Sequence, residues 1–421
     1  MSDRDWLFSL EQIGIKLGLD QIRALLAALD HPDRAYPSIV IAGTNGKGSV
    51  TAMVERGLRA AGYRTGRYTS PHLVDLEERF AIDGHSIGPA DVDRLAARIR
   101  AAADSLEHPP SFFEATTALA LEAFRDAPVD VAVLEVGLGG RLDATNAVAS
   151  TAVAITAVDF DHQEYLGHTL PEIAAEKAGV IKPHGLVVLG ENPEVVRDVV
   201  ADAATRQQAR LVYASEGVTL DAVMTDGQLV ATIQTPRAAY GDLHIGLRGR
   251  HQASNAVVAI RLLEELNAAG LFRVPSAAIR AAIEDVTWPG RLETRAWRGR
   301  EVLIDGAHNP AGARALASYL REVAPRPVPF VIGAMRDKDV AEMLAALAPV
   351  ASAFICTSAQ SSRALTPAEL LAQARSVAPA VPAQTAASPL QALEIASRLG
   401  PRIVVAGSLY LAGEVRASLG R

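Results

Sequence analysis

The sequence predicts an α/β protein with two domains: a mostly parallel sheet domain that contains a P-loop, followed by a smaller, Rossmann-like α/β domain. Three observations predict this class. The chain has 421 residues, more than one hydrophobic core usually holds. Short apolar, β-branched runs alternate with helical stretches, which is typical of a parallel sheet with helices on both faces. The same alternation starts again after a Pro-Gly boundary in the last third of the chain.

The first α/β pattern fills the N-terminal half of the chain. Its strand-like runs are residues 38–41, 131–134, 153–156 and 186–189, and its helical stretches include 50–61 and 92–103. Between 217 and 247 the pattern changes to short alternating strands, which predicts an antiparallel edge or a small separate sheet. A helix is expected at 252–269.

The second α/β pattern begins after the stretch TWPGRLE, residues 287–293, whose Pro-Gly pair is typical of a boundary. Its strand-like runs are 302–304, 330–332, 353–355 and 403–405. We therefore predict one domain at residues 1–293 and a second at 294–421. The sequence shows no fixed-period repeat and no low-complexity tract.

Composition and charge exclude several classes of protein. Hydrophobic residues make up 49% and charged residues 21%, values normal for a globular chain. A net charge of −7 with no long basic run argues against nucleic acid or an anionic membrane as the main partner. The N-terminal residues do not resemble a signal peptide, and the longest apolar run is broken by Pro349. With Cys356 as its one cysteine, the chain is expected in the cytoplasm.

The basic residues are almost all arginine. Of 41 Lys plus Arg, five are lysine, namely Lys16, Lys47, Lys177, Lys182 and Lys338. Arginine serves where only positive charge is needed, whereas a primary amine differs in geometry and reactivity. A retained lysine can therefore mark a place that needs an amine, although chance survival is the alternative for any one of them.

A glycine-rich loop follows the first strand-like run. The stretch IVIAGTNGKGSV passes from an apolar strand through Gly43–Ser49 into a helix, which predicts a cradle for nucleotide phosphates. Lys47 would reach the terminal phosphates. The loop departs from the common P-loop pattern, because Ile41 stands where the first glycine is expected and Gly48 separates Lys47 from Ser49. The alternative is a tight structural turn.

Glu135 is a second candidate for a ligand-binding residue, on the basis of its position alone. It ends the strand-like run 131–134 and precedes a glycine-rich turn, so its carboxylate falls at the carboxyl end of a buried strand, where ligands bind in open α/β sheets. The alternative is a carboxylate that caps a helix or pairs with Arg141. For His162, residue type and position alone favour a structural histidine.

Nine motifs, taken together in order, resemble one family. They are AGTNGKGS (42–49), YTSPHL (68–73), SFFEATTA (111–118), LEVGLGGRLDATN (134–146), DHQEYLG (161–167), EIAAEKAGVIKP (172–183), HQASNA (251–256), WPGRLE (288–293) and DGAHNP (305–310). This set resembles the folylpolyglutamate synthase family, in particular its bacterial bifunctional dihydrofolate synthase/folylpolyglutamate synthase branch, which is related to the Mur ligases. The resemblance covers essentially the whole chain.

The resemblance implies an ATP-dependent ligase. ATP would phosphorylate a substrate carboxylate, and the amine of L-glutamate would attack the acyl phosphate. Two Mg²⁺ sites are implied, with Ser70, Glu135, His162 and Lys177 as ligands, Lys177 as a carbamate. Arginine cannot form a carbamate because it stays protonated, which would explain a lysine here. Without the family, a salt bridge of Lys177 with Glu176 or Glu172 would be preferred. The resemblance leaves open whether K⁺ assists.

The resemblance also implies a set of binding residues. Lys47, Lys177 and His162 are the implied catalytic residues. The ATP-binding candidates are Asn45, Gly46, Lys47, Gly48, Ser49, Asn255, Arg291 and Asp305. The pterin or folate candidates are Gly18, Leu19, Phe112, Phe113, Glu114, Asp143 and Ala144. The glutamate candidates are Lys338 and Ser408. His308, Asn309 and Ser408 are weaker candidates for residues at the expected cleft between the domains. Read without the family, Phe112 and Phe113 are core residues and Ser408 lies in a turn.

Three alternatives to the bifunctional ligase stay open. A folylpolyglutamate synthase without the first activity would use the same nucleotide and metal machinery. A Mur-type amino-acid ligase fits less well, because the SPHL, FFE and GGRLDATN motifs match the folate branch. A P-loop NTPase switch would form no amide. The expected partners are dihydropteroate, tetrahydrofolates and L-glutamate, with no nucleic acid and no membrane, and the family suggests a monomer.

Overall fold

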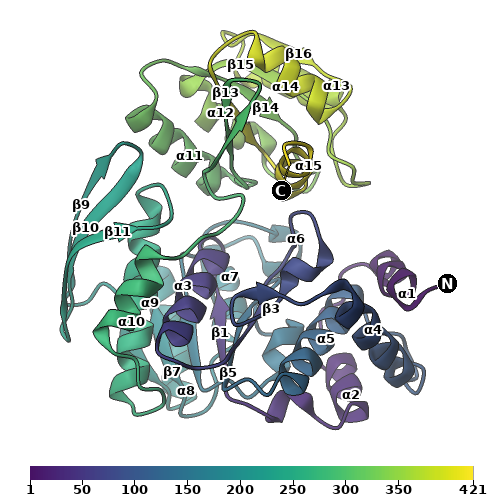
Figure 1. The fold of residues 1–421 in the computed structure, drawn as a ribbon, viewed down its shortest axis with the longest axis vertical. Helices are drawn as coiled ribbons and strands as arrows, with labels where there is room; N and C mark the ends of the chain where they lie inside the picture. Colours follow the sequence, from purple (N-terminus) through teal and green to yellow (C-terminus); the bar gives the residue numbers. More distant parts are fainter. Residues whose placement is uncertain (421) are drawn as a thin grey trace. The chain divides into compact units, whose positions relative to one another are not determined.

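The computed structural model describes residues 1–420, whose elements are drawn in Figure 1. The chain forms two compact units. The first consists of Met1–Asp221, Thr232–Leu243 and Ser254–Val286, and the second of Ala222–Ala231, His244–Ala253 and Thr287–Arg421. The division at residues 293 and 294 remains a prediction.

The first unit is built on an eight-stranded sheet that is parallel except at one edge. In spatial order its strands are β4 (His85–Ser86), β3 (Phe80–Ile82), β2 (Thr65–Tyr68), β5 (Val131–Glu135), β1 (Ser38–Ala42), β6 (Ala152–Ile155), β7 (Leu186–Leu189) and β8 (Arg210–Tyr213). Only the β2–β3 and β3–β4 pairs are antiparallel. All four runs predicted in this half are strands of this sheet, which confirms the predicted mostly parallel α/β class.

Helices bury both faces of this sheet. The helices of the first unit are α1 (Asp3–Ser9), α2 (Asp20–Ala28), α3 (Lys47–Ala60), α4 (Pro89–Ala103), α5 (Phe112–Asp126), α6 (Gln163–Leu166), α7 (Leu170–Ala178), α8 (Glu194–Arg206), α10 (Ser276–Glu284) and most of α9 (His251–Ala268), whose first residues belong to the second unit. Side chains alternate between faces along a strand. Val40 and Ala42 of β1 join the core formed with α2, α4, α5, α7 and α8. Ile39 and Ile41, equally buried, lie on the opposite face, where α3 packs against α10.

Strand register brings several loops to one edge of the sheet. Ile41 of β1 is level with Glu135 of β5, Ala42 with Ile155 of β6, and Tyr68 of β2 with Leu134. These four strands are parallel, so their carboxyl ends coincide. The loops that follow them therefore lie together at the edge where open α/β sheets bind ligands.

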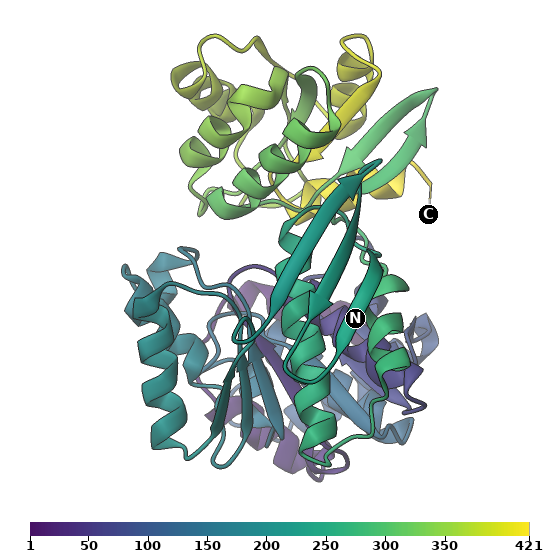
Figure 2. The ribbon, with the colours of Figure 1, turned by 90° about the vertical axis from the view of Figure 1, so that its left-hand side faces the viewer.

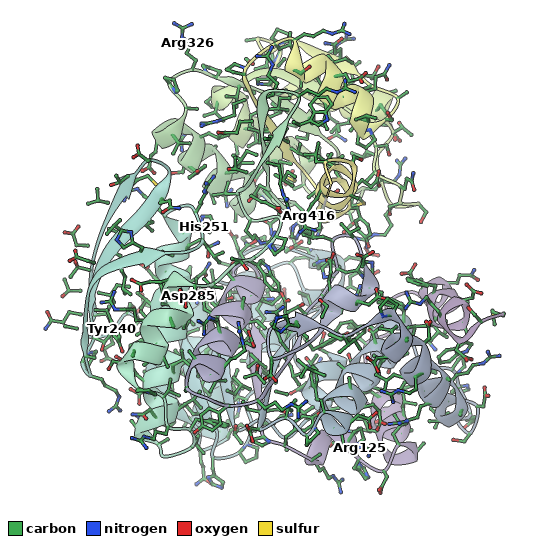
Figure 3. The ribbon with its side chains drawn as sticks, viewed as in Figure 1. Arg125, Tyr240, His251, Asp285, Arg326 and Arg416 are labelled. Atoms are coloured by element: carbon green, nitrogen blue, oxygen red, sulfur yellow. The ribbon has the colours of Figure 1, made fainter. Side chains whose placement is uncertain are left out.

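Of the two forms predicted for residues 217–247, the structure has the small separate sheet. Its strands β9 (Thr219–Thr225), β10 (Gln228–Gln234) and β11 (Ala239–Ile245) lie in the order β11-β10-β9, drawn in teal in Figure 2. Tyr240 of β11, labelled in Figure 3, donates its hydroxyl hydrogen to Glu264 of α9 at 3.0 Å. Glu264 also accepts from the Thr235 hydroxyl at 2.7 Å. These buried bonds hold the β10–β11 end of the sheet against α9.

The second unit contains a six-stranded sheet. Its strands, in spatial order, are β12 (Glu293–Trp297), β13 (Arg300–Ile304), β17 (Arg402–Ala406), β14 (Val328–Ile332), β15 (Ala351–Cys356) and β16 (Ala383–Thr385). Its helices are α11 (Pro310–Val323), α12 (Val340–Leu347), α13 (Pro367–Val377), α14 (Pro389–Ser397) and α15 (Leu409–Ser418). Only the β12–β13 pair is antiparallel. The four runs predicted here are β13, β14, β15 and β17. In residues 1–420, no helix combines the length and hydropathy needed to cross a membrane.

Candidate active site

The predicted phosphate loop joins β1 to the N-terminus of α3. Gly43 has φ 141° and Gly46 has φ 89°, and Gly46 is the N-cap of the helix that starts at Lys47. A methyl group on Gly43 would overlap the Thr156 hydroxyl, and one on Gly46 would overlap the Asn255 side chain. The loop thus needs glycine for its conformation and for close packing. It presents backbone N–H groups at a helix N-terminus, which favours an anion. Gly46 and Asn255, both ATP candidates, lie together.

The segment after β6 fixes the shape of the loop. The Thr44 N–H donates to the Ala157 carbonyl at 2.7 Å, and the Thr156 hydroxyl donates to the Asn45 carbonyl at 2.7 Å. The Thr44 hydroxyl donates to the Asp159 carbonyl at 3.0 Å. Sequence reasoning missed Thr156 and Asp159. Thr156 ends the predicted run 153–156 and Asp159 follows it, and this place at the end of a buried strand was the available signal.

Two of the five lysines share one backbone acceptor in this loop. Lys47 Nζ donates to the carbonyls of Gly43 at 3.2 Å and Thr44 at 3.0 Å. Lys177 Nζ, from the last turn of α7, donates to the same Gly43 carbonyl at 2.9 Å. The structure therefore brings Lys177 to the phosphate loop, although Lys177 lies 134 residues after Gly43 in the sequence.

The Lys177 amine is poised to lose its proton. Lys177 is 3% exposed. Burial, and then the charge of Lys47, lower the pKa of Lys177 to about 7, although Asp161 and Asp143 act in the opposite direction. Neutral amine is thus present near neutral pH, and neutral amine is the form that reacts with CO₂.

The salt-bridge alternative for Lys177 does not match the contacts. Glu176 accepts two hydrogen bonds from the Arg141 guanidinium, at 2.7 and 3.0 Å. The Glu172 carboxylate accepts from Thr169 and from the His168 N–H at the start of α7. Within residues 1–420, Lys177 forms no ion pair with either. An ion pair between Glu135 and Arg141 was one alternative role for Glu135. The Arg141 guanidinium pairs with Glu176 instead.

Glu135 and Ser70 lie side by side at the carboxyl edge of the sheet. Glu135 is 6% exposed, and its Oε2 accepts a hydrogen bond from the Ser70 N–H at 3.2 Å. The peptide bond between Ser70 and Pro71 is cis. The buried carboxylate and the Ser70 hydroxyl offer hard oxygen donors of the kind that Mg²⁺ prefers.

His162 is the N-cap of α6 and has a left-handed backbone conformation, with φ 49°. Its N–H donates to Asp161 Oδ1 at 2.9 Å, and its Nε2 lies 3.9 Å from the same oxygen. Asp161 also acts on the pKa of Lys177, which places this segment near the lysine.

The donor set fits a divalent cation that keeps most of its water. In residues 1–420, no three His, Cys, Asp or Glu side chains converge on one metal position. Mg²⁺ usually takes one or two protein ligands together with phosphate and water oxygens, so separate pairs suffice. The Ser70–Glu135 and Asp161–His162 pairs are such donors. The roles assigned to the candidate ligands remain proposals.

The pterin candidates gather around the loop after β5. The Gly18 N–H donates to the Leu142 carbonyl at 3.4 Å, and the Phe113 ring packs against Gly137. Asp143 accepts from the Leu138 N–H at 2.8 Å and the Thr145 N–H at 3.0 Å. Burial raises the pKa of Asp143 to about 6 against these hydrogen bonds. Asp143 therefore shapes this loop.

The remaining pterin candidates lie at the start of α5 and nearby. The Phe112 ring stacks on Phe8, with centroids 5.9 Å apart, and the Arg79 guanidinium lies over it at 5.1 Å. Glu114 accepts from the N–H and hydroxyl of Ser111, which caps the helix. Ala144 is buried. Leu19, Phe112 and Phe113 are partly buried against the core.

In the second unit, Arg291 and Asp305 lie together beyond β13. Asp305 accepts from the Leu292 and Ala307 N–H groups, both at 2.9 Å. Burial raises the pKa of Asp305, and the charge of Arg291 opposes that shift. The Arg291 guanidinium packs on Gly306, where a methyl group would overlap it. The ATP candidates thus form two groups, one in each unit.

The glutamate candidates follow neighbouring strands of the second sheet. Ser408, after β17, is buried and its hydroxyl accepts from the Leu411 N–H at 3.0 Å, as the N-cap of α15. Lys338, after β14, lies 3.7 Å from Asp337. His308 Nδ1 lies 2.7 Å from the Gly306 carbonyl, and Asn309 caps α11.

Comparisons with known proteins place this chain among the Mur ligases. Residues 41–263 match the Mur ligase middle domain, and residues 290–409 match the Mur ligase glutamate ligase domain. Dihydrofolate synthase/folylpolyglutamate synthase of Mycobacterium tuberculosis is 40% identical to this chain, over 96% of this chain and 90% of that protein.

Solved structures of related proteins match this chain over its whole length. A Mycobacterium tuberculosis folylpolyglutamate synthase complexed with ADP and AMPPCP has a TM-score of 0.91 and 37% identity, covering 100% of this chain and 99% of the other. A bifunctional folylpolyglutamate synthase/dihydrofolate synthase with Mn, AMPPNP and L-glutamate bound has a TM-score of 0.87 and 30% identity, with 100% and 98% covered. The chain belongs to the dihydrofolate synthase/folylpolyglutamate synthase family of the Mur ligases, as its motifs predicted.

Proposed function

We propose that this chain is an ATP-dependent ligase that adds L-glutamate to 7,8-dihydropteroate, making dihydrofolate, and to the γ-carboxylate of reduced folates. The reaction passes through an acyl phosphate and releases ADP and phosphate. The observation that carries the proposal is the meeting of Lys47 and Lys177 on the Gly43 carbonyl of the phosphate loop. Membership of the dihydrofolate synthase/folylpolyglutamate synthase family supports the choice of substrates.

The first unit brings two anions together. The N–H groups of the phosphate loop, the α3 N-terminus and the Lys47 ammonium neutralise the ATP phosphates, which repel the substrate carboxylate. Ser49 of the loop and Asn255 beside Gly46 complete this phosphate site. The substrate lies toward Phe113 and the loop that Asp143 holds. Asp143 acts on the pKa of Lys177, which contacts the phosphate loop, and this supports a substrate carboxylate near that loop.

The metal site draws on side chains that the sequence motifs pointed to. Ser70, Glu135, His162 and Lys177 as a carbamate would hold Mg²⁺ at two sites. Mg²⁺ bound there would neutralise charge that develops on the transferred phosphoryl group. Carbamylation replaces a buried cation at Lys177 with an anion, which suits a cation-binding role. The near-neutral pKa of Lys177 supports this assignment.

The second unit supplies further contacts with ATP and the binding residues for glutamate. Arg291 contacts ATP phosphates, and Asp305 accepts from ribose hydroxyls. Lys338 and Ser408 bind the incoming glutamate, whose amine attacks the acyl carbon and displaces phosphate. The acyl phosphate hydrolyses readily, so water must be kept away from it until glutamate attacks. The enzyme works as a monomer in the cytoplasm, without nucleic acid or membrane partners.

The test is the dependence of ADP release on each substrate. With ATP and Mg²⁺, ADP release should require both dihydropteroate and L-glutamate, and likewise both tetrahydrofolate and L-glutamate. ADP release that ignores glutamate would support a P-loop NTPase switch instead. Release with tetrahydrofolate but not with dihydropteroate would support the monofunctional synthase, which shares all of the nucleotide contacts described above.

A further inference from the structure

An ion cluster lies at the carboxyl edge of the second sheet. Asp337 Oδ1 accepts a hydrogen bond from Arg363 Nη2 at 2.8 Å, and Asp337 Oδ2 lies 3.7 Å from Lys338 Nζ. One carboxylate thus holds two cations, one with each oxygen. Burial acts to raise the pKa of Asp337, but Arg363 and then Lys338 outweigh it and keep the pKa below its ordinary value. Asp337 is therefore a fixed anion.

Backbone bonds set the positions of the three residues. Lys338 follows β14 and Arg363 follows the adjacent parallel strand β15. The Arg336 N–H donates to the Arg363 carbonyl, and the Leu365 N–H donates to the Ala334 carbonyl, both at 2.9 Å. The two loops are thereby tied into one short ladder. The geometry of the cluster does not depend on its side chains alone.

The loop after β17, which carries Ser408, meets this ladder from the other side. The Gly333 N–H donates to the Ala406 carbonyl at 3.3 Å, and a methyl group on Gly407 would overlap the Gly333 carbonyl. The strands lie in the order β17-β14-β15. Ser408, Lys338 and Arg363 therefore follow three neighbouring parallel strands and share the edge where such sheets bind ligands.

Basic side chains of graded exposure line this edge. Asp337 pairs with Lys338 and with Arg363, and the neighbouring Arg336 pairs with Glu369 at 2.6 and 2.8 Å. Side-chain exposure rises outward through the cluster, from 6% at Lys338 to 28% at Asp337 and 49% at Arg363. The hydroxyl of Thr357, just after β15, is buried and has no hydrogen-bond partner in the described residues.

We infer that Arg363 is a specificity-determining residue for the incoming amino acid, and that Asp337 positions it together with Lys338 to recognise a carboxylate of that amino acid. This inference rests on the proposed function, in which Lys338 contacts glutamate. The amine of the amino acid must face the acyl phosphate, so its carboxylates are the groups left for recognition. A guanidinium presents two parallel N–H donors that match a carboxylate, which an ammonium does not.

The test compares substitutions of two arginines with the same exposure. Arg363→Gln should raise the KM for L-glutamate by about 10- to 100-fold, the range expected for loss of a hydrogen bond to a charged group. The KM values for ATP and for dihydropteroate should stay unchanged. Arg363→Lys should recover part of the loss, because it keeps the charge without the planar fork. Asp337→Asn should also raise the KM for L-glutamate, by less than Arg363→Gln.

Arg336→Gln is the matched control. Arg336 is also 49% exposed and lies on the same ladder, but its guanidinium faces Glu369. Its substitution should leave the KM for L-glutamate within about twofold of the unsubstituted enzyme. An unchanged KM for L-glutamate in Arg363→Gln, or an equal rise in Arg336→Gln, would overturn the inference while leaving the ligase intact. Absence of glutamate-dependent turnover in the unsubstituted enzyme would instead overturn the proposed function.

Two amides of glutamate show which carboxylate is recognised. Glutamine lacks the γ-carboxylate and isoglutamine lacks the α-carboxylate. For the unsubstituted enzyme, the amide that has lost the recognised carboxylate should bind poorly. In Arg363→Gln, that amide should lose its disadvantage relative to glutamate, since the partner group is gone. Equal preference ratios in both enzymes for both amides would overturn the assignment of Arg363.

Discussion

Lys177 shows at the scale of one residue how the fold changes the chemistry of a side chain. On an exposed helix its amine would stay charged at neutral pH. Here the last turn of α7 buries it beside Lys47 and lowers its pKa to about 7. Gly140 makes this burial possible, because a methyl group there would overlap the Glu176 carbonyl and crowd the Lys177 backbone.

Replacing Lys177 by arginine tests the proposed carbamate directly. Lys177→Arg should lower kcat by at least about 100-fold, because guanidinium cannot react with CO₂, while the fold stays intact. Steady-state kinetics and circular dichroism measure the two effects. Activity of the unsubstituted enzyme should also fall in CO₂-depleted buffer and return with bicarbonate. Full activity in the arginine variant would rule out the carbamate.

Replacing Lys47 tests whether the two pterin substrates share one nucleotide site. Lys47→Ala removes the ammonium that we propose neutralises the terminal phosphates, so kcat/KM for ATP should fall by at least about tenfold. The fall should be similar with dihydropteroate and with tetrahydrofolate. A loss with only one of them would contradict a shared site.

At the scale of elements, the phosphate loop depends on close packing at Gly46. Gly46→Ala should raise the KM for ATP and lower the free energy of unfolding by about 1–2 kcal/mol or more. The reasons are the positive φ and the overlap with Asn255. Kinetics and thermal unfolding measure both.

Gly62→Ala is the control for this change. Gly62 has φ 95°, but no atom lies within 4 Å of a methyl group placed there. Gly62→Ala should therefore cost stability through backbone strain alone and leave the KM for ATP unchanged. If both variants changed the KM equally, packing against Asn255 would not be the cause.

Much of this arrangement could be predicted from the sequence, and the rest depends on strand order. Short apolar runs such as 38–41 and 131–134 predict strands, and the glycine loop marks a strand-to-helix turn. The antiparallel edge strands β3 and β4 were missed because they are three and two residues long. The cluster of Asp337, Lys338 and Arg363 was missed because nothing in the chain says that β14 and β15 are neighbours.

At the scale of the whole molecule, two half-buried histidines should make stability depend on pH. Burial, and then the charge of Arg291, lower the pKa of His251 to about 4. Burial and Arg79 do the same for His72. Below about pH 6.5 these histidines bind protons in the unfolded chain, while in the native protein they stay neutral until about pH 4. Acidification therefore favours unfolding. Asp143, with its pKa raised to about 6, opposes this between about pH 6 and 4.

The expected outcome is a melting temperature that falls as the pH is lowered from 6.5 toward 4. His251 is the first residue of α9 and is labelled in Figure 3. His251→Gln should reduce the dependence of the melting temperature on pH, because glutamine does not titrate. Differential scanning calorimetry across this range checks the prediction. A slope that is equal in both proteins would mean that His251 does not contribute.

The central claim is that one chain ligates glutamate to two different acceptors, and a product assay by mass spectrometry tests it most directly. Purified enzyme with ATP, Mg²⁺ and L-glutamate would receive dihydropteroate in one reaction and tetrahydrofolate in another. The account predicts addition of one glutamate to dihydropteroate and of one or more to tetrahydrofolate. Addition to tetrahydrofolate alone would contradict the first activity, and addition to neither would contradict the proposed ligase.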